Sequence, residues 1–379
     1  MSGHLGLNDE QHALLALVRE ITAREIAPNA SAWEGDAVFP RDAFNALGKA
    51  GLLGLAYPEE YGGGGQPYWV YLLAIEQLAY ALLSVGLGVS VQTLTVFPTF
   101  AYGTEEQRAR WMPPALAGEW IGSYCLSEPE GGSDAAALKT RAVRDGDSYV
   151  INGTKAWVTH GGVSDYYVVF CRTGDEGPKG ISLLFVPAST SGVSAAKPED
   201  KMGMKSSPTT QVTFSDVRVP VDHLIGDEGV GFRIAMEALD GGRLGIAACS
   251  VGLAQASLDA ALSFARERKQ FGTAIAQFQG ISFMLADMAT NIEAARALTM
   301  DAGRRRSAGV PYSSQAAMAK LFASDTAMRV TTDAVQIHGG YGYVDEFPAE
   351  RYMREAKVLQ IVEGTNQIQR LVIGRALTR

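Results

Sequence analysis

At 379 residues the chain exceeds the length at which one hydrophobic core normally keeps growing, so we expect two or three packed units. Hydrophobic residues make up 47% and charged residues 20% of the sequence, which is ordinary for a globular protein and excludes a disordered chain. The formal net charge of -8 argues against broad nucleic-acid binding, although a local basic site for a phosphorylated ligand stays open.

The first ten residues are polar and Gly-rich and carry no secretory signal pattern, so we expect a cytoplasmic protein. No stretch is apolar for long enough to predict a membrane span.

Cys125, Cys171 and Cys249 are spaced too widely for a zinc site or a disulfide framework and are expected to be reduced, buried thiols. The histidines form no metal-binding pair, so we expect no metal.

The first part of the chain is predicted to be helical. Between Asn8 and Ala117, apolar residues such as Leu14 and Ile21 recur at helical spacing, with prolines as punctuation. The glycine run 62–65 lacks side chains for packing and is costly to order, so it is predicted to form a loop between helices.

After Gly118 the pattern changes to a small all-β unit that runs to about Asp227. Short segments rich in β-branched and aromatic residues alternate there with Gly, Asp and Pro turns. These segments are Tyr149–Ile151, Tyr166–Cys171, Ile181–Val186, Val212–Phe214 and Val217–Val219.

From Gly229 onward, long segments rich in Ala and Leu predict a second helical unit, a bundle of long antiparallel helices. The predicted helices are Ile234–Arg268, Ile281–Ala308 and Ser314–Gln336. The fold class is therefore α+β in the order helical, β, helical, with domains 1–119, 120–228 and 229–379.

Two segments of the β unit could contact a polar ligand. Residues 124–134 run from an apolar strand end into a loop rich in Gly, Ser and carboxylates, which can donate backbone N–H and hydroxyl groups. An ordinary surface turn would have the same composition. In residues 155–159, Trp157 and Thr159 share one face of a strand, a pattern that alone is more often typical of core packing than of a cofactor platform.

Three segments of the second helical unit carry further chemistry. Residues 266–272 end a long helix with several cations, which stabilise a helix C-terminus without any ligand; a phosphate clamp is the alternative. Residues 336–342 and 361–367 each interrupt a helical pattern with glycine. Glu363 stands between an apolar pair and a glycine, and a buried carboxylate is costly unless it is paired or functional.

Together and in this order, the five segments resemble the acyl-CoA dehydrogenase family over essentially the whole chain. Leu126–Asp134 is similar to the family's first signature, and Lys155–Thr159 resembles its Trp-Ile-Thr strand with Val158 in place of Ile. The resemblance implies an N-terminal helical domain, a middle β-barrel or β-sandwich domain and a C-terminal four-helix bundle. It also implies FAD as cofactor and a homotetramer.

The reaction implied by the resemblance is α,β-dehydrogenation of a short acyl-CoA, straight or methyl-branched, to the trans-2-enoyl-CoA, as in fatty-acid or branched-chain amino-acid breakdown. Glu363 would remove the α-proton, the β-hydride would pass to flavin N5, and an electron-transfer flavoprotein would take the electrons. A minority of relatives place the base at the position of Gly242, where glycine cannot serve. An oxidase, a relative acting on an acyl carrier protein or a nitroalkane, and a catalytically silent flavoprotein scaffold remain alternatives.

The resemblance also assigns residues to the site. Those expected to contact FAD are Tyr124, Leu126, Ser127, Gly132, Ser133, Trp157, Thr159, Arg268, Gln270, Phe271, Gln336, Gly340, Thr365 and Gln367. Those expected along the substrate channel are Ser133, Asp240, Arg243 and Gly364. The five residues from Arg268 to Gly340 match positions that reach the FAD of a neighbouring subunit. Glu130 and His160 depart from the family pattern, and His160 is expected to be a satisfied structural histidine.

Overall fold

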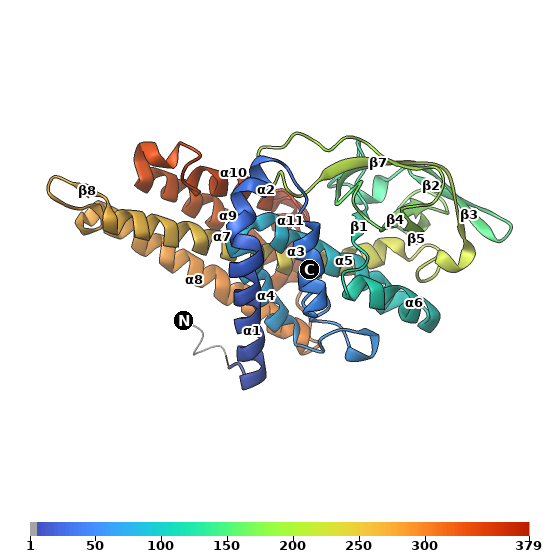
Figure 1. Cartoon of the computed structure of the whole chain (residues 1–379). Helices are drawn as coiled ribbons and strands as arrows, with labels where there is room; N and C mark the ends of the chain where they lie inside the picture. Colours follow the sequence, from blue (N-terminus) through green and yellow to red (C-terminus); the bar gives the residue numbers. More distant parts are fainter. Residues whose placement is uncertain (1–5, 379) are drawn as a thin grey trace.

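The computed structural model describes residues 6–378, which fold in three consecutive parts (Figure 1). Helices form the first part, a sheet the second and long helices the third, so the predicted order is confirmed. Residues 1–5 and Arg379, which the sequence analysis assigned to the first and last units, lie outside the described residues.

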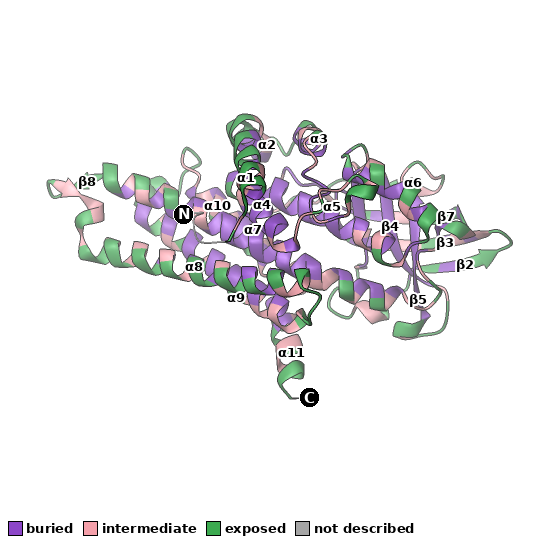
Figure 2. Ribbon diagram, turned by 90° about the horizontal axis from the view of Figure 1, so that it is seen from below, coloured by how far each residue is buried: buried purple, intermediate pink, exposed green. Residues whose placement is uncertain are grey.

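The first part builds much of the central core. Its helices are α1 (Asp9–Ile21), α2 (Ala30–Gly35), α3 (Arg41–Lys49), α4 (Tyr68–Ala81), α5 (Leu83–Tyr102) and α6 (Glu105–Leu116). The side chain of Asn8 caps α1 by accepting from the backbone N–H of Gln11 at 2.8 Å. The glycine run 62–65 forms a loop before α4, as predicted. Figure 2 shows buried residues along α4 and α5, which lie beside α7.

The second part is a seven-stranded sheet. Its strands are β1 (Gly122–Cys125), β2 (Arg141–Asp145), β3 (Ser148–Thr159), β4 (Tyr166–Arg172), β5 (Ile181–Pro187), β6 (Val193–Ala195) and β7 (Thr209–Pro220). They pair in the order β1-β4-β2-β3-β7-β6, and β5 also pairs with β4. The segments Val212–Phe214 and Val217–Val219 belong to one strand, because a bulge that includes Asp216 (φ 50°) lets β7 continue.

The third part packs long helices against the first. It contains α7 (Gly231–Glu267), α8 (Gln279–Ser307), α9 (Ser313–His338), α10 (Ala349–Leu359) and α11 (Asn366–Leu377), with a short hairpin of β8 (Lys269–Gln270) and β9 (Thr273–Ala274). The central helix α7 packs against α4, α5, α8 and α9. Figure 1 places the β8–β9 hairpin at the end of the molecule opposite the sheet.

By length and composition, α5 and α7 could cross a membrane, which the sequence analysis did not recognise. In this fold, however, 89% and 83% of their apolar windows are buried. Core helices of this kind pass the same test, so the apolar runs are explained by packing. The three cysteines are free and buried, as predicted. Across residues 6–378, no group of three His, Cys, Asp or Glu side chains is arranged to hold a metal ion.

Candidate active site

Glu363 lies in the tight turn that joins α10 to α11. The backbone is left-handed at both Glu363 (φ 56°) and Gly364 (φ 86°), a conformation that costs a non-glycine residue about 1–3 kcal/mol. The side-chain amide of Gln369 donates to the carbonyl oxygens of Glu363 at 3.2 Å and Gly364 at 2.7 Å. Thr365 caps α11 by accepting from the N–H of Ile368 at 3.3 Å. Side chains of α11 thus hold the strained turn in shape.

The Glu363 carboxylate keeps one oxygen free of hydrogen bonds. The residue as a whole is only partly buried, but Oε2 has no exposed surface and no partner. Burial raises the pKa of Glu363 to about 7, and the charges of Arg243 and Lys320 oppose this rise. A Cβ atom at Gly242 would lie 2.3 Å from Oε2, so the carboxylate fills the space beside that glycine. This group can accept a proton near neutral pH.

Two expected substrate-channel residues lie beside this carboxylate on α7. Arg243 forms an ion pair with Asp240, and Asp240 also accepts from the hydroxyl of Ser313 at 3.0 Å. Burial raises the pKa of Asp240, while Arg243 lowers it. Because Arg243 also lowers the pKa of Glu363, the structure brings Asp240, Arg243 and Glu363 into one electrostatic neighbourhood.

The sheet brings Tyr124 near the same carboxylate. Burial raises the pKa of Tyr124 on β1, and the nearby Glu363 carboxylate raises it further. Trp157 on β3 has a left-handed backbone (φ 60°) and a 64% exposed side chain. The pairing of β3 with β7 shifts between Lys155 and Val158, so the simple alternation assumed from the sequence is interrupted by a bulge.

A buried ion pair shapes the loop that follows β1, and the sequence analysis missed it. The ammonium of Lys155 donates to the carbonyl oxygen of Leu126 at 3.1 Å and to Glu128 at 2.9 Å. Glu128 also accepts from the backbone N–H groups of Lys139 at 2.6 Å and Thr140 at 2.9 Å. The loop that contains Ser127, Gly132 and Ser133 is therefore anchored at its base from inside the fold.

The two departures from the family pattern lie in different environments. Glu130 is exposed and paired with Lys139. His160 is buried between Phe39 and Phe44, and its Nδ1 lies 3.2 Å from a carbonyl oxygen of β1. Burial lowers the pKa of His160 to about 4, which favours a neutral ring. Because Nε2 has no partner, the expectation of a satisfied histidine holds for only one ring nitrogen.

A second group of expected cofactor residues lies far from Glu363 in the same chain. This group occupies the β8–β9 hairpin and the adjoining ends of α7 and α9 (Figure 1): Arg268, Gln270, Phe271, Gln336 and Gly340. Phe271 is 98% exposed, and the Arg268 guanidinium stacks over Tyr341 at 5.3 Å from the ring centroid. Within one chain, the expected flavin contacts therefore form two separate sets.

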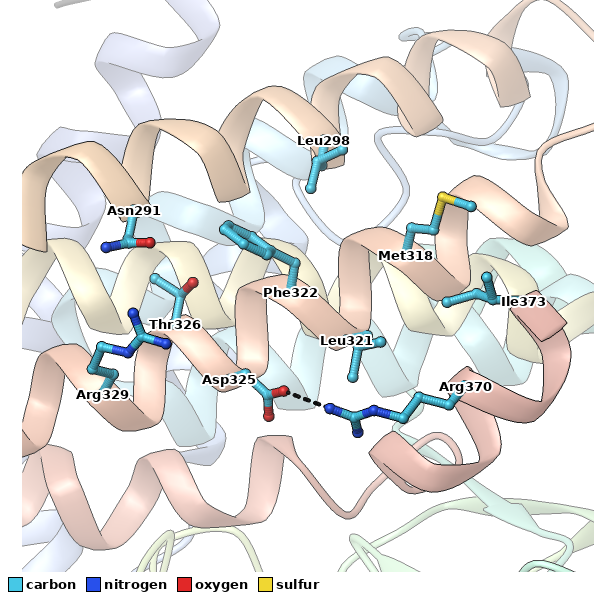
Figure 3. Close-up of a pocket in the computed structure, with 10 residues that line it drawn as sticks. All are labelled: Asn291, Leu298, Met318, Leu321, Phe322, Asp325, Thr326, Arg329, Arg370 and Ile373. Carbon is cyan, nitrogen blue, oxygen red and sulfur yellow. Dashed lines mark hydrogen bonds and ion pairs between the residues drawn. The ribbon is translucent and has the colours of Figure 1, made fainter. Parts of the chain in front are cut away.

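Two surface pockets lie elsewhere. One, of about 480 Å³, is enclosed by α8, α9 and α11 and is drawn in Figure 3, where Asp325 pairs with Arg370 at 3.2 Å. The other, of about 600 Å³, is lined by Tyr68, Phe97 and Arg306 among others. Glu363 lines neither pocket, but Asp325 also accepts from Asn366, which follows the turn that carries Glu363, at 2.7 Å.

Comparison with known proteins gives one consistent result. Three family profiles match in order: the N-terminal domain of acyl-CoA dehydrogenases over residues 8–119, the middle domain over 123–217 and the C-terminal domain over 229–378. A short-chain-specific acyl-CoA dehydrogenase of Clostridium acetobutylicum is 43% identical over 98% of this chain and 99% of its own.

Solved structures agree. Butyryl-CoA dehydrogenase of Megasphaera elsdenii is similar with a TM-score of 0.96 and 41% identity, covering 98% of this chain and 99% of the other. A chain from a structure described as the electron transferring flavoprotein of Acidaminococcus fermentans is similar with a TM-score of 0.97 and 45% identity, covering 99% of both chains.

Proposed function

The chain belongs to the acyl-CoA dehydrogenase family, and on that premise we propose that it desaturates short acyl-CoA thioesters between the α and β carbons, with Glu363 as the base. The observation that carries the proposal is the Glu363 carboxylate, whose Oε2 is buried without a partner while the pKa is raised to about 7. The short-chain assignment is supported by relatives named for short-chain acyl-CoA and butyryl-CoA.

Proton removal follows from the surroundings of this carboxylate. Poor solvation raises its proton affinity, which strengthens it as a base toward the weakly acidic α-carbon. Arg243 and Lys320 hold the pKa low enough for the group to be ionised near neutral pH. Because Oε2 makes no hydrogen bond within residues 6–378, it can accept the α-proton without first breaking a contact there.

We infer FAD as the cofactor, and the side chains present fit a flavin nucleotide. Trp157 exposes an aromatic face, and the N–H of Ala156 donates to the carbonyl oxygen of Ser127 at 3.0 Å, which sets that face next to the polar loop. Tyr124, Thr159, Thr365 and Gln367 are the further expected contacts. When bound, FAD supplies the acceptor for the hydrogen that leaves the β-carbon as hydride.

Assembly and electron transfer belong to the same proposal. The β8–β9 hairpin and the adjoining ends of α7 and α9 lie at the end of the molecule opposite the sheet (Figure 1), which supports a homotetramer in which the expected flavin contacts there, from Arg268 to Gly340, complete a neighbour's site. An electron-transfer flavoprotein is the proposed acceptor, supported by the likeness to the Acidaminococcus fermentans structure. A silent scaffold would have no need for a strained turn that carries an unpaired carboxylate.

Anaerobic mixing of the purified flavoprotein with butyryl-CoA tests the proposal, with the visible absorbance of the flavin as readout. The wild type should bleach, and Glu363→Gln should bleach about 10²–10⁴-fold more slowly because it lacks the general base. Glu130→Gln is the matched control, since it removes an exposed carboxylate from the same chain. Bleaching of Glu363→Gln within about tenfold of the wild-type rate would show that Glu363 is not the base.

A further inference from the structure

Lys320 is a fully buried cation that donates hydrogen bonds to neutral oxygen atoms. It lies in the first third of α9, with 0% of the residue exposed. Its ammonium donates to the carbonyl oxygen of Gly364 at 3.0 Å and to Oδ1 of Asn366 at 2.8 Å. No ion pair joins Lys320 to a carboxylate within residues 6–378. Burying an unpaired cation costs roughly several kcal/mol, so Lys320 lowers the stability of the fold unless its contacts compensate.

The contacts of Lys320 continue to the protein surface. Nδ2 of Asn366 donates to Ser324 at 2.9 Å and to Asp325 at 2.7 Å, which turns the amide oxygen toward Lys320. Asp325 is itself paired with Arg370 beside the pocket in Figure 3. A continuous polar chain therefore runs from a surface ion pair to the carbonyl group next to Glu363.

This chain acts on the part of the backbone that is strained. Gly364 follows Glu363 directly, and its carbonyl oxygen receives donors from both Lys320 and Gln369. Two donors on one carbonyl group restrict rotation of that peptide unit, and with it the direction of the Glu363 side chain. The ammonium is also the second positive charge, after Arg243, that stabilises the ionised Glu363.

We propose that Lys320 is a positioning residue for the proposed base: through Gly364 and Asn366 it holds the turn that aims Glu363, and it brings a positive charge to the residue that follows Glu363. This rests on the proposed function, because it takes Glu363 as the base. The titratable groups around this pair are Arg243, Asp240 and Cys249 on α7, Asp325 on α9, Tyr68 on α4 and Tyr124 on β1.

Lys320→Met is the central variant, because it keeps an unbranched side chain and removes the charge and both hydrogen bonds. The two acceptors retain other donors, Gln369 for Gly364 and Ser324 for Asn366, so the variant should fold. Lys357→Met is the matched control, since Lys357 is an exposed lysine on the neighbouring helix α10.

The readout is the rate of flavin reduction by butyryl-CoA as a function of pH. In Lys320→Met the acid limb should move to higher pH by about one unit, the usual effect of removing a nearby opposite charge. The plateau rate should also fall about tenfold or more, because a misdirected base is inefficient. Asn366→Ala keeps the ammonium but breaks the chain, so its plateau should fall while its acid limb stays in place.

The pKa of Glu363 can also be followed without turnover. The free energy of unfolding is measured against pH for the wild type and for Glu363→Gln, and the difference between the two changes with pH where Glu363 titrates. Repeating that comparison in the Lys320→Met background should move the transition to higher pH. Two results would overturn the role of Lys320. One is that Lys320→Met changes neither the pH dependence of the stability difference nor the pH dependence of the rate. The other is that the rate falls equally at every pH, with no shift of the acid limb. A wild type that butyryl-CoA does not reduce would instead refute the proposed function, while the stability comparison still decides on Lys320.

Discussion

Moving the carboxylate from the turn to α7 tests whether Glu363 and Gly242 face the same substrate atom. A Cβ at Gly242 would lie 2.3 Å from Oε2 of Glu363, so the two positions compete for one space. Gly242→Glu alone must displace the existing side chain, and a glutamine at 363 would leave the clash in place. Glu363→Gly removes the clash, because glycine has no side chain. Glycine also adopts the left-handed φ of 56° without steric cost.

The structure sets the expected stability of the double variant Glu363→Gly, Gly242→Glu. Glycine at 363 relieves about 1–3 kcal/mol of backbone strain, and replacing a glycine inside α7 gains about 1 kcal/mol of helix propensity. The rise in the pKa of Glu363 from 4.5 to about 7 corresponds to a net cost of about 3 kcal/mol for ionising the carboxylate in the folded protein. We expect a carboxylate at position 242 to have a similar cost, because it would occupy the same space. The double variant should therefore be as stable as the wild type or slightly more stable.

The assay is anaerobic flavin reduction by butyryl-CoA, with FAD content and thermal unfolding as checks on folding. Glu363→Gly should lose about 10²–10⁴ in rate, and the added Gly242→Glu should recover at least about tenfold of it. Gly241→Glu in the same background is the control, because a side chain there would point at Arg306, whose Nη1 lies 1.9 Å from the position of that Cβ. A folded, FAD-loaded double variant no faster than Glu363→Gly alone would refute the shared-space reasoning.

Three further predictions concern the carboxylate, the cofactor and the substrate. Glu363→Gln should stabilise the protein above about pH 7, because the pKa of Glu363 is about 7 in the folded protein and 4.5 for an ordinary glutamate. The gain, measured by thermal unfolding, should shrink as pH falls through 7 and vanish below 4.5. Arg268→Ala should lower FAD retention, since a charge-assisted contact contributes about 1.5–3 kcal/mol, and unchanged FAD affinity by titration would count against that contact. Butyryl- or isobutyryl-CoA should reduce the flavin faster than palmitoyl-CoA, and a preference for long chains in a thioester panel would contradict the short-chain proposal.

Local patterns predicted most of the fold because they depend on near neighbours in sequence. The helix expected over 234–268 is α7 at 231–267, since apolar periodicity and the terminal cations mark its ends. Pairing between distant strands was not predictable in this way. The bulge at Trp157 and the continuity of β7 depend on how β3 and β7 align, and that register is set by contacts about sixty residues apart.

The same local reasoning reached only part of the candidate site. Glu363 stood out because a carboxylate between apolar residues and a glycine is unusual in a helical pattern. Lys320 did not, because a lysine within a helical segment normally reads as solvent-exposed. Its burial exists only because α9 faces the turn before α11, which brings Lys320 and Gly364 together across 44 residues of chain. The surroundings of His160 were not predictable for a similar reason: its ring packs against Phe39 and Phe44, which lie far from it in the sequence.

The arrangement of charges around Glu363 reconciles two opposing needs of a buried base. Burial strengthens the base but would leave it protonated, whereas a direct ion pair would ionise it but occupy the oxygen that must accept a proton. Here two cations lower the pKa from separate helices, and each is bound to something else: Arg243 to Asp240, and Lys320 to Gly364 and Asn366. Neither is paired with Glu363, so Oε2 stays free. On the proposal that Glu363 is the base, the partners that restrain Arg243 and Lys320 leave the proton-accepting oxygen open, so they are expected to contribute to the chemistry along with the cations.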